Sequence, residues 1–505
     1  MRNNKKTLLF LFILLTIIFC YFRLKPIYFQ TIPYTFDQGR DFLKAQEIIR
    51  DKNLMFIGPT TGVQGIFHGA WWYYFLAIPY VLFSGNPLGF VLFIFLSAFI
   101  QYFLFYLFIK KEFDSKSSLL FASLIAGSSY FIGTSYFAIN SIMTFPFILL
   151  FFFSLYKFLG KKENKYLLLI FLSLGFIFEF EVAFGIFIIP SFLISILILR
   201  KFKDFFPNFK SSLYAFIGLL IPIVPRIMFE IKNNFPELKI ILAFIINPKI
   251  YDSKTLTERI YDRFLLFYNY YASLFPDKNI FLALIAILIL IVGLIMGYRK
   301  FSKIKKNFLK ITLSTFGLLF ILSLFYKDNF WSNYYEGLPY FYALFLSIGA
   351  YGFQKNKFKQ KYFNFIPIFF ISIIIIVSLF NLIKDIKTIK PEEITGMRVQ
   401  TTVVSKLYKH VGSKDLCVRI YTPPVIPYTY TYLFDYFSRK NGLKYPFDNF
   451  KEGKCYFIME KEQEGYNFEQ RIVKWRLENI PKNTVLVKKE FVGDNVVIEL
   501  WQEKQ

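Results

Sequence analysis

Histidine and cysteine are scarce in this chain, which has 2 His and 3 Cys in 505 residues. The cysteines fit no metal-binding spacing, because Cys20 lies in the first apolar run and Cys417 and Cys455 lie far apart near the C-terminus. The composition therefore argues against a zinc site built on cysteine. Cys417 and Cys455 each sit in a strand-like segment, which leaves a disulfide and two unpaired thiols as alternatives.

Charged residues are also few, at 19% of the chain against 55% hydrophobic and 22% aromatic residues. They are absent from the whole run Ser117 to Tyr156. A membrane span needs about 20 apolar residues, so this run can hold two helices joined by a turn near Tyr136 to Ser141. The mean hydropathy of +0.44 is too high for a soluble enzyme of this size. These features predict a polytopic α-helical membrane protein.

The net charge of +26 comes from short basic clusters between apolar runs. This distribution indicates membrane topology and argues against nucleic acid as a partner. The positive-inside rule places five clusters in the cytoplasm: Lys110/Lys111/Lys116, Lys157/Lys161/Lys162/Lys165, Arg200/Lys201/Lys203/Lys210, Arg299 to Lys310, and Lys355 to Lys361. All five clusters fall on the cytoplasmic side only if the segment Trp71 to Gly85 lies at the membrane interface and does not cross the membrane. It predicts about eleven spans in the plasma membrane, with a cytoplasmic N-terminus and an extracytoplasmic C-terminal domain.

This topology predicts two domains. Residues 1–384 are expected to form a transmembrane domain with extracytoplasmic loops at 24–86 and 230–278, and residues 385–505 a small extracytoplasmic domain. The second domain contains the strand-like segments CVRIYT, CYFIME, TVLVKKEFV and NVVIELW and a helix around Tyr466 to Leu477. Strands mixed with a helix predict an α/β fold for this domain.

The first loop contains the clearest local signal. Thr35 and Gln38 have the spacing of a capping box, which predicts a helix that begins there and runs toward Arg50. Its first turn is where a helix dipole favours a negative charge. Helical spacing puts four charged residues on one face: Asp37, Arg40, Asp41 and Lys44. The alternative is an ordinary solvated helix with salt-bridged charges.

Other polar residues are predicted on the same side of the membrane. His68 stands where an aromatic interfacial helix begins and could bind phosphate or a metal, or serve only as a loop residue. Glu179 and Glu181 are two residues apart, so on one continuous helix only one of them can face a shared cavity, where an acid is costly and usually functional or paired. Arg226, after a Pro-Ile-Val-Pro run, could clamp a phosphate or pair with Glu230.

Three motifs together resemble a known family. They are Asp37 with Arg40, the run His-Gly-Ala-Trp-Trp-Tyr-Tyr from His68, and the run Tyr-Tyr-Glu-Gly-Leu-Pro from Tyr334. The layout is similar to the GT-C-fold protein mannosyltransferases (glycosyltransferase family 39) and to lipid A aminoarabinose transferases. Two departures argue against protein mannosylation: Gln38 follows Asp37 where the family often has Glu, and Gly69-Ala70 replaces Pro-Pro.

The resemblance implies inverting transfer of a sugar from a polyprenyl-phosphate donor to a hydroxyl acceptor on a protein, lipid or polysaccharide at the outer face. It assigns Asp37 as general base, with Asp41 as a second candidate. It places Arg40, His68, Arg226, Tyr334 and Tyr335 around the carrier phosphate. Residues of the cavity or acceptor site would be Glu181, Asn140 and Glu230.

The chemistry agrees with this assignment. An attacking hydroxyl needs a carboxylate to take its proton, and a cation can stabilise the departing phosphate. No cofactor is therefore required, and a divalent metal is possible but not indicated. A transporter or flippase of lipid-linked sugars is the main alternative, and an envelope protein that only binds glycans is another. A transporter would place charges near the midplane and show repeats, whereas these charges cluster toward one face.

Overall fold

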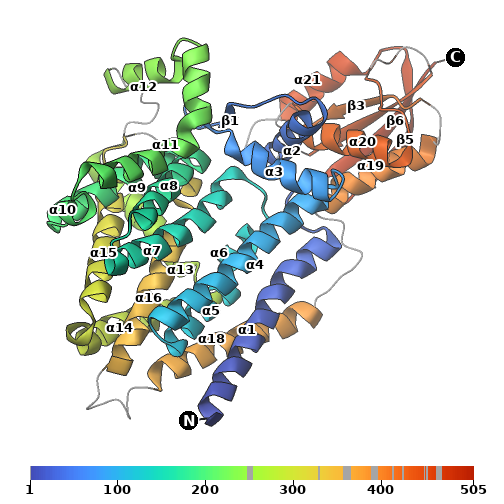
Figure 1. Cartoon of the computed structure of the whole chain (residues 1–505). Helices are drawn as coiled ribbons and strands as arrows, with labels where there is room; N and C mark the ends of the chain where they lie inside the picture. The colour runs from blue at the N-terminus through green and yellow to red at the C-terminus, as the bar shows by residue number, and fades with distance from the viewer. Residues whose placement is uncertain are drawn as a thin grey trace. The chain divides into compact units, whose positions relative to one another are not determined.

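The computed structural model describes residues 2–246, 254–327, 330–355, 365–387, 396–411, 415–423, 426–448, 450, 453–461 and 469–504. The chain forms two compact units (Figure 1). The first unit comprises Met1–Arg23, Leu54–Tyr74 and Ile94–Thr388. The second unit comprises Leu24–Asn53, Phe75–Phe93 and Ile389–Gln505.

Three helices contribute residues to both units: α1 (Arg2–Phe29), α3 (Trp71–Leu82) and α4 (Pro87–Glu112). The first unit also contains a short antiparallel hairpin of β1 (Ile57–Thr60) and β2 (Phe67–Gly69). Its remaining elements are helical: α5 (Ser115–Gly127), α6 (Ser129–Thr134), η1 (Asn140–Met143), α7 (Thr144–Lys161), α8 (Asn164–Phe180), α9 (Val182–Ile198), α10 (Phe202–Phe205), α11 (Phe209–Lys232), α12 (Pro236–Ile246), α13 (Leu256–Ala272), η2 (Pro276–Lys278), α14 (Ile280–Gly297), η3 (Tyr298–Lys300), α15 (Lys303–Ser323), η4 (Ser332–Tyr335), α16 (Leu338–Lys355) and α18 (Ile366–Lys387).

Many of these helices can cross a bilayer. Among the described residues, seven are long and apolar enough: Lys6–Phe29, Pro87–Glu112, Asn140–Lys161, Phe209–Lys232, Ile280–Lys300, Lys303–Ser323 and Ile366–Lys387. The helix Val182–Ile198 is apolar but shorter. The polytopic helical fold is thus confirmed, while the number of about eleven spans stays a prediction. Most of the cluster Lys355 to Lys361 and residues 247–253 of the second loop lie outside the described residues.

Two sequence predictions can be compared with the helices: the structure contains the predicted turn, and the placement of one segment at the membrane interface stays a prediction. The turn predicted near Tyr136 to Ser141 matches the non-helical stretch between α6 and η1. The segment predicted to lie at the interface forms α3, whose 12 residues extend about 18 Å at 1.5 Å per residue. A hydrocarbon core of about 30 Å is too thick for α3 to cross.

Arg23 is a fully buried cation within the first unit. Its Nε donates to Ser135 Oγ at 2.9 Å, and its Nη2 donates to the carbonyl of Ile125 at 2.9 Å. Its Nη1 donates to the carbonyls of Phe19 and Ala126 at 3.1 and 3.3 Å. The last carbonyls of a helix have no partner within the helix, and two of these acceptors end α5. Arg23 therefore joins α1 to the end of α5.

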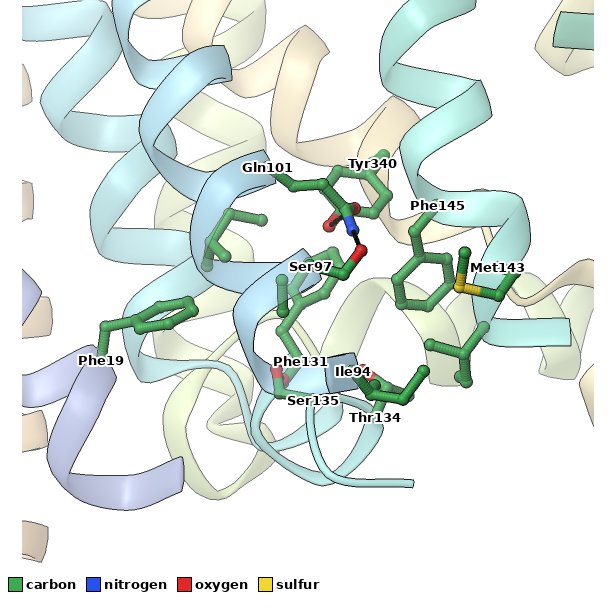
Figure 2. A pocket seen from close by; sticks show the side chains of 13 residues that line it. Phe19, Ile94, Ser97, Gln101, Phe131, Thr134, Ser135, Met143, Phe145 and Tyr340 are labelled. Atoms are coloured by element: carbon green, nitrogen blue, oxygen red, sulfur yellow. Dashed lines mark hydrogen bonds between the residues drawn. The ribbon is translucent and has the colours of Figure 1, made fainter. Parts of the chain in front are cut away.

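A small cavity lies between α1, α4, α6, α7 and α16 (Figure 2). Its lining is mostly apolar, and Gln101 donates to Ser97 Oγ at 3.0 Å across one wall. The volume is about 10 Å³, which is the space of roughly one water molecule. This cavity is a packing defect between helices and is too small for a sugar or a lipid headgroup.

The second unit contains the α/β fold predicted for the C-terminal residues. Its elements are α2 (Phe36–Arg50), α19 (Met397–Val411), β3 (Val418–Tyr421), α20 (Tyr428–Asn441), β4 (Lys454–Glu460), α21 (Glu469–Asn479), β5 (Thr484–Val492) and β6 (Val496–Glu503). The sheet order is β3-β4-β6-β5, with β3 parallel to β4 and the other pairs antiparallel. The four strands agree with the four predicted segments. Residues 466–468 of the predicted helix lie outside the described residues.

A disulfide joins Cys417 to Cys455 across the first two strands of this sheet, with a Cα–Cα distance of 4.7 Å. The parallel register pairs Val418 with Tyr456, so the preceding residues of the two strands face each other. Both sulfurs lie in a core that also contains Tyr421, Phe457 and Met459. The structure thus selects the disulfide from the two alternatives.

Replacing both Cys417 and Cys455 by serine should lower the free energy of unfolding by about 2–4 kcal/mol, because the unfolded chain regains the freedom of the closed loop. Thermal unfolding of the purified full-length protein measures the change. Cys20→Ser is the control, since Cys20 lies on α1 outside the disulfide. Equal melting temperatures for the double variant and the wild type would contradict a stabilising crosslink.

The first-loop helix packs on the C-terminal residues. The ring of Phe42 stacks on Phe90 with centroids 3.9 Å apart and meets Tyr432 of α20 edge-on at 5.5 Å. Gly39 allows the approach, because a Cβ there would lie 2.5 Å from the backbone nitrogen of Thr429. Helix α2 and residues after 389 therefore belong to one compact unit.

Candidate functional site

The β1–β2 hairpin brings His68 and Gly69 against the end of α8 in the first unit. A Cβ on Gly58 would lie 2.3 Å from the carbonyl oxygen of Gly69, so the two strands need glycine for their close pairing. His68 is buried in this position. Trp71, at the start of α3, donates from its indole Nε1 to the carbonyl of Pro222 on α11 at 2.7 Å. These contacts fix the hairpin against α8 and α11.

Arg226 lies beside the hairpin in a buried cluster of three charged residues, here called the Arg226 cluster. Its Nε donates to Glu179 Oε1 at 2.8 Å, and its Nη1 donates to both carboxylate oxygens of Glu237 at 2.9 and 2.8 Å. Glu237 also accepts the backbone N–H of Phe67 at 2.7 Å. The cluster holds two carboxylates and one guanidinium. Charges buried this way need such pairing to offset the loss of water.

Two polar atoms of the Arg226 cluster remain open. Among the described residues, neither Arg226 Nη2 nor Glu179 Oε2 has a hydrogen-bond partner. An unbonded guanidinium N–H in a buried site can donate to an anionic ligand. Arg226 Nη2 therefore keeps hydrogen-bonding capacity that the pairs of the cluster do not use.

Gly69→Ala should destabilise the Arg226 cluster. A Cβ at residue 69 would lie 1.8 Å from Glu179 Oε2 and 2.6 Å from its carboxylate carbon, so strand or helix must move. Overpacking of this kind costs about 1–3 kcal/mol. Thermal unfolding of purified protein measures the loss.

Gly317→Ala is the matched control, because a Cβ there meets nothing within 4 Å. Gly317 lies inside α15, where alanine favours the helix by up to about 1 kcal/mol. Equal behaviour of the two variants would show that the contact between Gly69 and Glu179 is loose.

Glu181 and Asn140 do not join the Arg226 cluster. Glu181 interrupts the helical path between α8 and α9, with φ −143° and ψ 96°, and is buried. Asn140 donates from Nδ2 to the carbonyl of Phe180 at 2.7 Å, which satisfies one of the free carbonyls at the end of α8. Glu179 is thus the acid of this pair that meets Arg226. The predicted roles of Glu181 and Asn140 at a cavity or acceptor site stay predictions.

The alternative pairing of Arg226 with Glu230 is wrong, because each has other partners. Glu230 accepts the backbone N–H groups of Glu237 and Leu238, both at 3.1 Å, at the start of α12. Free N–H groups at a helix N-terminus attract a carboxylate. Glu230 therefore positions α12, and α12 presents Glu237 to Arg226.

Tyr334 and Tyr335 point in different directions from η4. The Tyr335 ring is fully buried against Phe184 and Phe330, and its hydroxyl donates to the carbonyl of Leu319 at 3.0 Å. The Tyr334 hydroxyl lies close to Gly62 of the first loop, where a Cβ would come within 2.6 Å of it. Tyr335 has a clear packing role, and the phosphate contact of either tyrosine stays a prediction.

Glu336 follows these tyrosines in the connection between α15 and α16. The Tyr130 hydroxyl donates to its carboxylate and to its backbone carbonyl. Burial raises the pKa of Glu336 to about 7, while the bond from Tyr130 opposes the rise. The Glu336 carboxyl is therefore a weaker acid than that of an exposed glutamate. Its half-buried position was not evident from its place in a polar, Gly-containing motif.

The first-loop charges lie on α2 in the second unit. The helix runs from Phe36 to Arg50, and Thr35 donates its backbone N–H to Gln38 Oε1 at 2.9 Å, as the capping box predicts. Arg40 pairs with Asp37 at 3.0 Å and with Asp41 at 2.8 Å. The Asp37 side chain is 58% exposed, whereas that of Asp41 is 1% exposed. Asp37 is thus the carboxylate that an incoming molecule can reach.

The two units hold different parts of the predicted site. The first unit joins the hairpin of His68 to Arg226 through Glu179 and Glu237, and the second unit joins Asp37 to Arg40 and Asp41. Glu237 was not among the predicted site residues. Within the described parts of the chain, no three His, Cys, Asp or Glu side chains come together as a metal site would need.

Known proteins resemble this chain at two levels. A family model described as dolichyl-phosphate-mannose-protein mannosyltransferase matches residues 68–229, a stretch that contains Glu179 and Arg226. The crystal structure of ArnT from Cupriavidus metallidurans bound to undecaprenyl phosphate aligns with 97% of this chain and 97% of its own, at a TM-score of 0.55 and 10% identity. The chain has the fold of ArnT.

The apo crystal structure of the same ArnT aligns with 96% of this chain and 97% of its own, with a TM-score of 0.57 and 9% identity. No curated protein sequence matches the chain. The ArnT fold includes the C-terminal residues as well as the helical part, since nearly the whole chain aligns. The predicted resemblance and the predicted GT-C-like fold are thereby confirmed.

Proposed function

We propose that this protein is a membrane glycosyltransferase that transfers a sugar from a polyprenyl-phosphate donor to a hydroxyl group of an acceptor. The reaction inverts the anomeric carbon and takes place at the extracytoplasmic face. The observation that carries the proposal is the ArnT fold over nearly the whole chain, since an ArnT crystal structure contains undecaprenyl phosphate. The family match over residues 68–229 supports the same reaction class.

Arg226 stabilises the negative charge that develops on the carrier phosphate. When the bond between the anomeric carbon and the phosphate oxygen breaks, negative charge grows on the phosphate. Arg226 Nη2 is free to donate to it, while Glu179 and Glu237 hold the guanidinium in place. His68 lies on the strand that the cluster anchors and is a second candidate for the phosphate.

Asp37 acts as the general base for the acceptor hydroxyl. The acceptor hydroxyl attacks the anomeric carbon, and its proton passes to the Asp37 carboxylate. Asp37 is exposed enough to meet an acceptor, and Arg40 holds it from one side at 3.0 Å. Asp41 is the second candidate base, although its side chain is enclosed.

Release of polyprenyl phosphate tests the reaction class. The purified protein, reconstituted in proteoliposomes with undecaprenyl-phosphate-linked sugars and candidate acceptors, should form free undecaprenyl phosphate and a glycosylated acceptor. A flippase would move the donor across the bilayer intact. Transbilayer movement without release would therefore overturn the proposal.

The extracytoplasmic placement of the first loop and of the C-terminal domain makes a separate prediction. In a Cys20→Ser background, Asn53→Cys and Lys474→Cys should react with a membrane-impermeant thiol reagent in intact cells. Both positions are exposed in the second unit, so reagent access depends on the side of the membrane. Mass spectrometry of the labelled protein measures the reaction. Protection of both in intact cells, with labelling after lysis, would invert the topology.

A further inference from the structure

A basic groove lies in the second unit where α19 and α20 meet the ends of two candidate spans. Its volume is about 480 Å³, within the range of small-ligand sites. Arg398 donates its backbone N–H to the carbonyl of Gln30 at 3.0 Å, directly after the end of α1. Tyr432 donates its hydroxyl to the carbonyl of Gly85 at 2.7 Å, directly before α4. The ends of spanning helices lie at the level of lipid headgroups, so the groove lies there too.

One face of α19 forms a wall of the groove. Arg398, Thr402, Ser405 and Lys409 follow one another at i, i+4, i+7 and i+11, which aligns them on that face. A cation therefore stands at each end of the row, with two hydroxyl groups between them. Lys440 of α20 adds a third cation to the lining.

Two of the lysines that line the groove, Lys409 and Lys440, carry charge that no described acidic side chain pairs with. None of the described lining residues is acidic. Lys406, which also lines the groove, forms an ion pair with Glu490 of β5. Lys409 and Lys440 are exposed and form no ion pair with a described residue, although Lys440 lies 5.6 Å from the ring of Tyr436. The groove thus has a net positive charge with hydroxyl donors at its centre.

We propose that this groove binds the phosphate of an anionic lipid headgroup in the surrounding bilayer. Arginine and lysine pair with phosphate oxygens, and hydroxyl groups donate to them, which is the set of donors in the groove. The bound lipid fixes α19 and α20 at the membrane surface. This inference goes beyond the proposed transfer reaction, which uses neither helix.

Native mass spectrometry of the full-length protein in detergent tests the proposal. The probes are dioctanoyl phosphatidylglycerol and dioctanoyl phosphatidylcholine, which share chains and a phosphate and differ in net charge. The wild type should bind the glycerol lipid more tightly. Lys409→Ala/Lys440→Ala should weaken that binding at least tenfold, and both side chains are exposed, so the fold should survive.

Lys474→Ala/Lys482→Ala is the matched control, since it removes two exposed lysines of the same unit outside the groove. It should bind the glycerol lipid like the wild type. Equal loss in both double variants, or no loss in the groove variant, would overturn the proposal. Inorganic phosphate that competes as well as the lipid would assign the groove to a free phosphate and would also overturn it. Sugar release is measured separately, so the two proposals can fail independently.

Discussion

Asp37→Asn should lower the rate of sugar transfer by about 100-fold or more, the usual scale of general-base catalysis. The amide cannot take the proton of the acceptor hydroxyl, whereas its shape and its place in the first turn of α2 are kept. Expression and donor binding should stay at wild-type levels, because the carrier phosphate is assigned to other residues. Initial rates of glycosylated acceptor formation, with donor binding measured in parallel, provide the test.

Asp41→Asn is the internal control for this prediction. Asp41 lies one turn further along α2 and pairs with the same Arg40, but its side chain is 1% exposed against 58% for Asp37. An enclosed carboxylate reaches an acceptor less readily, so its loss should cost less transfer. If Asp41→Asn abolishes turnover and Asp37→Asn does not, the two roles are exchanged.

The agreement between sequence and structure is best where the signal is local. Helix α2 begins and ends as the capping box and Arg50 predict, because its first free N–H groups find partners within three residues. The four strands of the C-terminal sheet also follow from local composition. Apolar, β-branched residues in short runs need only a neighbouring strand to form a sheet.

Helix α20 is an element whose secondary structure its local sequence does not predict. Its first five residues, YTYTY, alternate tyrosine with threonine, a composition typical of a strand. In the structure it buries Thr429, Tyr432, Leu433 and Tyr436, which follow helical spacing. Packing against α2 through Phe42 and Gly39 overrides the local preference. That contact joins residues almost 400 positions apart, so composition could not predict it.

The candidate site also contains features that local sequence predicts and features that depend on the tertiary fold. The prediction that one of Glu179 and Glu181 faces a cavity assumed a continuous helix, whereas the chain leaves the helix at Glu181. Glu237 had only a local signal, as an acid in the first turn of a helix that begins with Pro236. Its pairing with Arg226 depends on the path of the chain between α11 and α12. Buried ion pairs of this kind cannot be predicted from the sequence alone, because their partners come together only in the folded chain.

Arg226→Lys should weaken binding of the polyprenyl-phosphate donor by about tenfold or more. Lysine keeps the charge but has one nitrogen in place of the planar fork. It cannot reproduce the separate bonds from Nε to Glu179 and from Nη1 to Glu237 and still offer a further donor in the place of Nη2. A charge-assisted hydrogen bond is worth about 1.5–3 kcal/mol, and about 1.4 kcal/mol corresponds to a tenfold change in affinity.

Glu237→Gln distinguishes a phosphate-binding Arg226 from a purely structural one. The amide removes one negative charge beside the predicted phosphate position and can still accept the N–H of Phe67. If Arg226 holds the phosphate, donor binding should become tighter in Glu237→Gln and weaker in Arg226→Lys. Equilibrium binding of a labelled donor to protein in nanodiscs measures both, with thermal unfolding as a check on the fold. If both variants lose stability and neither changes the affinity of the folded protein, Arg226 serves only to hold α12 against α8.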